Sequence, residues 1–225
     1  MPTSDVISDA MEQVLQLQQQ WSISNTPPMQ TRGVLIRKVL PAAIKAFLGG
    51  PQAPQVAQAQ GSDGSGGKTR VPWVRVFDPD ASPRATAGWY LVYLFAADGS
   101  NIALSLNQGT SRPVYGATYQ AKPKSEILAA TQSGRAVLHA PAGWTTDITL
   151  ADVAKGPGEA YEFGNILAKV YSAGAVPTDE ILIKDLHEGT SLLQQLQEAI
   201  PTAVDLAPPL PSPATRLVAH RHWMT

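Results

Sequence analysis

The chain has 225 residues with a formal net charge of −1, and 44% of its residues are apolar. This length is sufficient for one sizeable domain, and a charge so near neutral argues against a protein that coats DNA without regard to sequence. The absence of cysteine excludes disulfides, thiolate metal sites and cysteine nucleophiles. It also fits a reducing compartment, so we expect a cytoplasmic protein. No stretch approaches the roughly 18–20 apolar residues of a membrane span.

The charges are distributed unevenly along the chain. Residues 61–124 carry seven basic and four acidic residues, a net charge of +3, whereas residues 125–200 carry four basic and ten acidic residues, a net charge of −6. A chain with one mildly basic segment can bind a polyanion on that side. Random variation of surface charge explains the same numbers, so charge alone leaves both interpretations open.

The first part of the chain predicts helices followed by a flexible loop. Residues 5–21 place apolar side chains at helical spacing, with glutamines on the other face. Residues 32–48 predict a second helical segment, in which Pro41 either kinks the helix or begins a new one. The sequence Gly-Gly-Pro at 49–51 is expected to end it. Residues 51–69 are rich in Gln, Ala, Gly and Ser, which predicts a flexible Gly/Gln-rich loop.

Strands are predicted next, in the arrangement of an antiparallel meander. Residues 71–77 alternate in character, and residues 88–95 are rich in aromatic and β-branched side chains. Asp98-Gly99-Ser100-Asn101 predicts a hairpin turn into a strand at 102–106. Alternation places Trp73 and Arg75 on one face of the first strand, and both faces of the second strand are apolar. A plain hydrophobic core and an aromatic pocket both explain that pattern.

The remaining elements complete an α+β fold. Residues 123–135 predict a helix, residues 145–150 and 165–171 predict short strands, and residues 178–198 predict a helix that begins with Thr178 at its N-cap. Five prolines lie between residues 201 and 213, which is typical of an extended tail or linker. We therefore expect a mostly antiparallel sheet flanked by helices in a domain at 1–200, and a Pro-rich tail at 201–225.

Local catalytic motifs are missing from the sequence. The segment Ser62–Thr69 resembles a phosphate-binding P-loop, but Ser62 replaces the first glycine and a strand rather than a helix is predicted to follow. The four histidines form no HExxH motif, and no carboxylates stand at metal-ligand spacing. We therefore expect no catalytic residues, no metal and no cofactor. A dispersed active site would leave no such motif and stays open.

Three segments together resemble a known family. They are Val-Pro-Trp at 71–73, GWYLVYLF at 88–95 and LSLNQGT at 104–110. In this order they are similar to the N-terminal DNA-binding domain of McrB-type, modification-dependent restriction systems, and the resemblance spans about residues 5–198. Residues 161–171 resemble the end of that domain. The resemblance implies binding of duplex DNA that contains 5-methylcytosine or 5-hydroxymethylcytosine, with the modified base flipped into an aromatic pocket.

The resemblance also implies roles for particular residues. It assigns the base pocket to Trp73, Tyr90 and Leu94, with Tyr161 as the opposite wall. The loop that enters the DNA corresponds to Gly64, Ser65 and Gly66. The family can carry an aromatic wedge in this loop, and Ser65 stands in its place. Phosphate contacts are expected from a set of three basic residues, Lys68, Arg70 and Arg84.

The resemblance places catalysis outside this chain. A nuclease or NTPase effector on another domain or subunit would perform the restriction or phage-defence reaction. Two alternatives remain open at this stage. The chain is a protein-interaction module of a defence complex that keeps the fold without reading DNA, or it is a nuclease whose metal-dependent site the sequence does not reveal.

Overall fold

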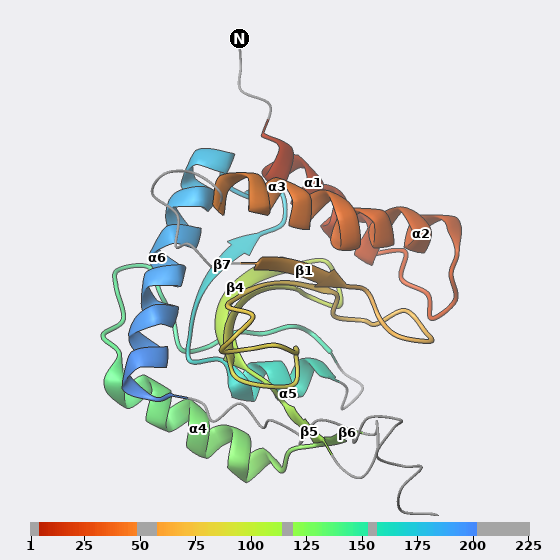
Figure 1. Cartoon of the computed structure of the whole chain (residues 1–225). Helices are drawn as coiled ribbons and strands as arrows, with labels where there is room; N and C mark the ends of the chain where they lie inside the picture. The colour runs from red at the N-terminus through yellow and green to blue at the C-terminus, as the bar shows by residue number, and fades with distance from the viewer. Residues whose placement is uncertain (1–4, 49–57, 114–118, 153–156, 202–225) are drawn as a thin grey trace, which may run out of the picture.

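A five-stranded antiparallel sheet is the centre of the molecule. The computed structural model describes residues 5–48, 58–113, 119–152 and 157–201. The sheet has the order β1-β2-β3-β4-β7, and helices pack around it (Figure 1), which confirms the expected α+β class. A separate two-stranded ribbon joins β5 (Ser111–Pro113) to β6 (Tyr119–Ala121). The sheet strands are β1 (Gln58–Ser62), β2 (Trp73–Phe77), β3 (Trp89–Phe95), β4 (Asn101–Gln108) and β7 (Leu167–Ser172).

The predicted meander is confirmed, and its middle strand is buried on both faces. All seven residues of β3 are buried, because β2 and β4 flank it and side chains cover both faces of the sheet. Tyr93 and its neighbours at alternate positions point to one face, and Tyr90, Val92 and Leu94 point to the other. The double apolar pattern of 88–95 therefore reflects a central strand between two hydrophobic clusters.

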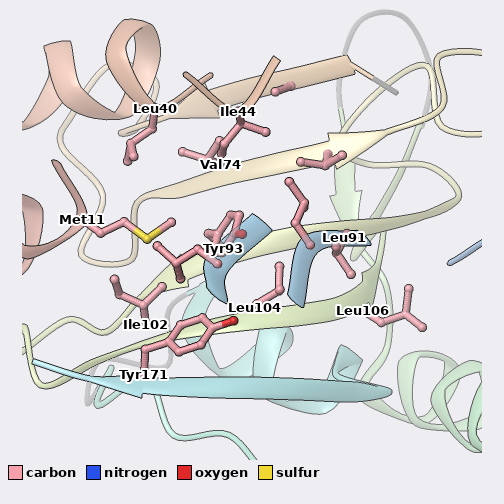
Figure 2. Close-up of a cluster of buried hydrophobic side chains, with 14 of the residues drawn as sticks. Met11, Leu40, Ile44, Val74, Leu91, Tyr93, Ile102, Leu104, Leu106 and Tyr171 are labelled. Atoms are coloured by element: carbon pink, nitrogen blue, oxygen red, sulfur yellow. The ribbon is translucent and has the colours of Figure 1, made fainter. Parts of the chain in front are cut away.

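Three helices cover one face of the sheet. They are α1 (Val6–Gln18), α3 (Leu40–Leu48) and α6 (Asp179–Ala199), and their apolar side chains join those of the sheet in the larger core cluster. Figure 2 shows Met11 of α1 and Ile44 of α3 pointing toward Val74 and Tyr93 of the sheet. Burial of these side chains supplies the main driving force for folding. The sheet face that α1, α3 and α6 cover is therefore part of the hydrophobic core.

The second helical segment contains a π-helical turn. It begins at Pro27, earlier than the predicted residue 32, and runs through α2 (Pro27–Val34), the π-turn η1 (Leu35–Val39) and α3. Leu40 donates its backbone N–H to the carbonyl of Leu35, five residues earlier. The next residue, Pro41, has no N–H with which to continue the α-helical ladder. Pro41 therefore lies in the first turn of α3, which agrees with the predicted start of a new helix at this proline. The predicted stop at 49–51 lies outside the described residues.

One prediction about the Gly/Gln-rich segment is wrong. Residues 58–62 lie in the predicted loop of 51–69, yet they form β1 at the edge of the sheet, paired with β2. The strand contains no large apolar side chain, and at Gly61 it packs closely on the π-turn η1. A Cβ atom built on Gly61 would lie 1.8 Å from the carbonyl oxygen of Ile36. Residues 63–72 do form a connection without regular structure apart from turns and bends, and residues 51–57 lie outside the described part.

The C-terminal predictions were mostly confirmed. The predicted helix at 123–135 is α4 (Lys124–Val137), and the predicted strand at 165–171 is β7. The predicted strand at 145–150 is wrong, because only Thr145 makes a bridge, with Ala168 of β7. A short helix that was not predicted, α5 (Pro157–Gly164), precedes β7.

The N-cap of α6 is Thr178, as predicted, but another residue supplies the capping side chain. Thr178 occupies the N-cap, but its side chain makes no capping hydrogen bond to a described residue. Asp5 instead accepts a hydrogen bond from the backbone N–H of Asp179 at 3.0 Å. The Asp179 carboxylate in turn accepts the N–H groups of Ile7 and Ser8 at 3.1 and 2.8 Å. The two helix N-termini thus satisfy each other's free donors.

The predicted tail at 201–225 lies almost entirely outside the described residues, which end at residue 201. Among the described helices, none combines the length and the hydropathy that crossing a bilayer requires.

Candidate nucleic-acid interface

The four predicted pocket residues come together on the sheet face opposite α1, α3 and α6. Tyr90 and Leu94 of β3 belong to the smaller core cluster, and Trp73 of β2 and Tyr161 of α5 pack against it. Tyr90 is 3% exposed and Leu94 is fully buried, whereas Trp73 and Tyr161 are half-buried. The cluster therefore combines two buried side chains, Tyr90 and Leu94, with two aromatic side chains that are partly exposed.

A hydrogen bond orients Tyr90, and burial shifts the pKa values of both tyrosines upward. The Tyr90 hydroxyl donates to the backbone carbonyl of Gln108 at 2.8 Å. Burial raises the pKa of Tyr90 above its ordinary value, although the nearby Arg75 opposes that shift. Burial raises the pKa of Tyr161 to about 12, and a side-chain hydrogen bond with Trp73 works in the opposite direction. Both phenols are therefore neutral near pH 7, and Trp73 and Tyr161 interact directly.

Arg75 is a buried cation that sequence reasoning placed on this face without assigning it a role. Its guanidinium lies 3.6 Å from the centre of the Phe77 ring and 6.0 Å from that of Tyr90. It donates twice to the Gln60 side-chain oxygen, at 2.7 and 3.0 Å, and once to the carbonyl of Ser82 at 3.2 Å. Burial lowers its pKa to about 10, so it remains charged at neutral pH. Arg75 thus connects β1, β2 and the loop before β3.

The LSLNQG segment holds α5 against the sheet. Asn107 is fully buried and donates to the carbonyl of Tyr161 at 2.9 Å and to the Ser105 hydroxyl at 3.0 Å. Ser105 donates to the side-chain oxygen of Asn165 at 2.7 Å. A Cβ atom on Gly164 would lie 2.4 Å from the Asn107 side-chain oxygen, so α5 ends in close contact with β4. These polar residues therefore position the helix that carries Tyr161.

The next residue of the same segment fixes α4. Gln108 donates from its side chain to the carbonyl of Ile127 and to the hydroxyl of Thr131, both at 3.0 Å. Thr131 donates to the carbonyl of Phe163 in α5 at 2.8 Å. One strand end thus anchors both helices beside the pocket residues. The motif that suggested the family in the sequence has a structural role in supporting the site.

The predicted DNA-inserting loop lies at the end of the sheet that carries Trp73. Gly64, Ser65 and Gly66 follow β1, whose last residue, Ser62, pairs with Trp73. Gly64 and Gly66 have φ angles of 117° and 83°, which favour glycine. A Cβ atom on Gly66 would meet no heavy atom within 4 Å, so this part of the loop faces open space.

A buried network anchors both ends of this loop to the helices. Asp63 is 1% exposed and forms ion pairs with Arg37 and, at 2.6 Å, with Lys68. Burial alone would raise the pKa of Asp63, but hydrogen bonds and charges from Lys68 and Arg37 outweigh it and hold the pKa below its usual range. The loop is thus tied to η1 through the buried carboxylate of Asp63, which pairs with the more exposed Arg37.

A second anchor involves Gln18 and Arg32. The Gln18 amide donates to the carbonyls of Arg70 and Ala96 at 2.7 and 2.9 Å. Arg32 is fully buried and donates to the Gln18 side-chain oxygen and, at 3.0 Å, to the carbonyl of Thr69. Burial lowers the pKa of Arg32 to about 10, which leaves it charged at neutral pH. Sequence patterns gave no indication of either residue's role, because both lie within helices.

The three predicted phosphate contacts occupy different surroundings. Lys68 is 13% exposed at its side chain and pairs with Asp63. Arg70 lies over the Trp21 ring at 4.5 Å and 3.5 Å from the Asp152 carboxylate, with 36% of its side chain exposed. Arg84 is exposed on the connection between β2 and β3. Lys68 and Arg70 thus lie on the connection between β1 and β2, and Arg84 lies on the connection between β2 and β3.

A hollow of about 230 Å³ lies between α4 and α5, and none of the predicted site residues lines it. Its walls include Gln132, Arg135 and Glu162. Arg135 donates to the carbonyls of Thr146 and Asn165 at 2.8 and 2.7 Å, which accounts for part of its hydrogen-bonding capacity. Within the ranges that the structure covers, the acidic and histidine side chains form no group able to hold a metal ion.

Comparison with known proteins agrees with the resemblance of the three motifs. A search of curated proteins gives no match. The family model described as "MrcB-like, N-terminal domain" matches residues 16–198, which include the whole sheet and the four pocket residues. The chain therefore belongs to the family of MrcB-like N-terminal domains.

Proposed function

We propose that this domain reads 5-methylcytosine or 5-hydroxymethylcytosine in duplex DNA and thereby directs a restriction effector to the modified site. The family supports a DNA-binding recognition role in a restriction system. The proposed reading of a modified base is supported by one cluster of side chains from β2, β3 and α5. Its members are Trp73, Tyr90, Leu94 and Tyr161. Residues so distant in sequence meet here on the sheet face that α1, α3 and α6 leave uncovered.

The exposure of the four side chains suggests how a base would bind. Trp73 and Tyr161 are the rings that reach the surface, so a flipped base would stack against them. Tyr90 and Leu94 then lie deeper and would contact the substituent on the cytosine ring.

The proposed preference for modified cytosine can be estimated from the free energies of base flipping and of pocket contacts. Flipping a base costs a few kcal/mol of lost stacking and pairing for either base. Contact of a 5-methyl group with an apolar side chain such as Leu94 returns about 1 kcal/mol, which is about a fivefold preference from that contact alone. Aromatic stacking supplies about 1–3 kcal/mol for each ring that stacks. In the proposal these gains offset the cost of flipping only when the methyl contact is added, so unmodified cytosine stays in the duplex stack. A larger preference would require further contacts that only the modified base makes.

The surrounding residues would position the duplex. Lys68, Arg70 and Arg84 are proposed to contact phosphates, and the loop at Gly64, Ser65 and Gly66 to approach the flipped site. The chemistry would then belong to a nuclease or NTPase on another domain or subunit, in the cytoplasm. A Pro-rich segment such as 201–213 is a suitable linker to an effector.

A binding titration tests the proposal. Three duplexes of one sequence would carry cytosine, 5-methylcytosine or 5-hydroxymethylcytosine, and each would be titrated at two salt concentrations. We expect at least about fivefold tighter binding to one modified duplex, with the ratio retained at the higher salt. Equal binding to all three with a steep salt dependence would leave only a phosphate-binding surface. No binding would exclude DNA reading and favour the protein-interaction module.

A further inference from the structure

The loop between α1 and α2 lies beside the loop that follows β1. The backbone N–H of Lys68 donates to the carbonyl of Ile23 at 3.0 Å, and the Trp21 indole N–H donates to the carbonyl of Thr69 at 3.0 Å. Figure 1 shows the two connections next to each other, below α2 at the right of the view. Residues 21–23 and 63–69 therefore form one surface at the end of the sheet that carries Trp73.

Ile23 is exposed at this surface to an unusual degree for its type. Its exposed fraction is 67%, the highest of the large apolar side chains in the described part of the chain. Its neighbours Ser22, Ser24 and Asn25 are small or polar. A lone exposed apolar residue is common on protein surfaces, so exposure alone decides nothing. Ile23 also lies next to the proposed DNA-inserting loop, and this position together with its exposure indicates a role in DNA binding.

The backbone and a glycine hold Ile23 in place. The N–H of Ser24 donates to the Ser22 hydroxyl at 3.1 Å, and that of Thr26 to the carbonyl of Ser24 at 2.9 Å. A Cβ atom on Gly67 would lie 3.2 Å from a side-chain carbon of Ile23, so the glycine lets the two loops approach. Ile is also branched at Cβ, which restricts its first side-chain torsion. The backbone of this loop is therefore held beside the neighbouring loop, and branching at Cβ limits the first torsion of the exposed side chain.

A flipped base leaves a gap in the stack that some side chain or water must fill. Apolar side chains, isoleucine among them, serve as such wedges in DNA-bending proteins. Ser65, in the neighbouring loop, offers only a small polar side chain. We propose that Ile23 enters the duplex and fills the gap that the flipped cytosine leaves. This inference rests on the proposed base reading and adds the side chain that makes it possible.

The test compares Ile23→Ala with Ile181→Ala. Ile181 lies in α6 and is 48% exposed, so the second variant makes the same chemical change at a distant surface. Dissociation constants would be measured for duplexes with and without the modified cytosine, at low salt so that phosphate contacts keep both measurable. Thermal unfolding would be followed for each variant. Ile23→Trp would offer a larger stacking surface at the same position.

We expect Ile23→Ala to weaken binding of the modified duplex about fivefold, to near the level of the unmodified duplex, because an apolar side chain that the complex buries is removed. Binding of the unmodified duplex, where no base leaves the stack, should change by less than about twofold. Ile181→Ala should change neither, Ile23→Trp should bind the modified duplex at least as tightly as the wild type, and all unfolding midpoints should agree.

Other outcomes separate the two proposals. If Ile23→Ala kept the wild-type preference for the modified duplex, the proposed insertion of Ile23 would be wrong, and the proposed reading of the base would stand. If the variant lost affinity equally for both duplexes, Ile23 would only contact the DNA surface, and its proposed insertion would again be wrong. A wild-type protein without any preference would overturn the base reading, and the wedge with it.

Discussion

The ammonium group of Lys68 lies 2.6 Å from a carboxylate oxygen of Asp63, whose side chain is only 1% exposed. Arg37 pairs with the other oxygen of the same carboxylate. A lysine that was predicted to contact phosphate therefore also closes the loop between β1 and β2. This loop lies beside Trp73, so in the proposed function the ion pair would bear on recognition as well as on stability.

Replacement of Asp63 by Asn should destabilise the domain, because the buried carboxylate that pairs with Arg37 and Lys68 would be lost. We expect a loss of about 1–3 kcal/mol in the free energy of unfolding at pH 7. The pKa of Asp63 is lowered in the folded state, so its contribution is complete above the unfolded pKa of about 3.9 and disappears as the pH falls through the folded value. The difference between wild type and variant should therefore shrink in acid.

Urea unfolding at pH 7 and at several acid pH values would measure this difference. The matched control is Asp80→Asn, because Asp80 is exposed. It should change the free energy of unfolding by less than about 0.5 kcal/mol at every pH. If the two variants behaved alike, the buried ion pair would contribute nothing to stability.

Replacement of Asn107 by Ala should affect both stability and recognition. The change leaves the carbonyl of Tyr161 and the backbone N–H of Gln108 without their partner, at a cost of about 1–3 kcal/mol. Because α5 carries Tyr161, a looser helix should also weaken binding of the modified duplex more than that of the unmodified one. Thermal unfolding and duplex titration would measure the two effects. The control Ser133→Ala, at an exposed position of α4, should change neither the stability nor the binding preference. If Asn107→Ala kept the wild-type preference for the modified duplex, Asn107 would have no role in recognition.

Replacement of Arg84 by Ala should weaken DNA binding without changing its preference. A phosphate contact carries no base information, so the dissociation constants of modified and unmodified duplexes should rise by the same factor. The slope of log K against log salt should fall in magnitude by about 0.9 for the one contact removed. Titrations at four salt concentrations would measure the slope. If the variant had the same slope as the wild type, Arg84 would not contact a phosphate.

Alternation and composition predicted the centre of the fold well. The strands β2, β3 and β4 follow from alternating or aromatic-rich segments and from the Asp-Gly turn at 98–99, because these patterns describe pairing between neighbours in the chain. Helix periodicity likewise predicted α1, α4 and α6. The shared face of Tyr90 and Leu94 follows from their spacing in one strand.

Features that depend on distant contacts were missed. β1 contains only Gln, Ala, Gly and Ser, and its strand conformation depends on pairing with β2 and on the close approach of Gly61 to Ile36. Neither contact has a local pattern. The anchors formed by Gln18, Arg32 and Asp63 join three separate segments, so no spacing could reveal them. The reciprocal capping of α1 and α6 by Asp5 and Asp179 joins residues 174 positions apart in the chain.

The substitution Trp73→Ala tests the central claim most directly. Trp73 is half-buried at the start of β2, so its loss should leave the fold intact, which circular dichroism would verify. The ratio of dissociation constants for unmodified and modified duplexes should fall to about one, while binding of the unmodified duplex stays within about twofold of the wild type. A variant that folds and keeps the wild-type ratio would contradict the proposal that this aromatic cluster reads the base.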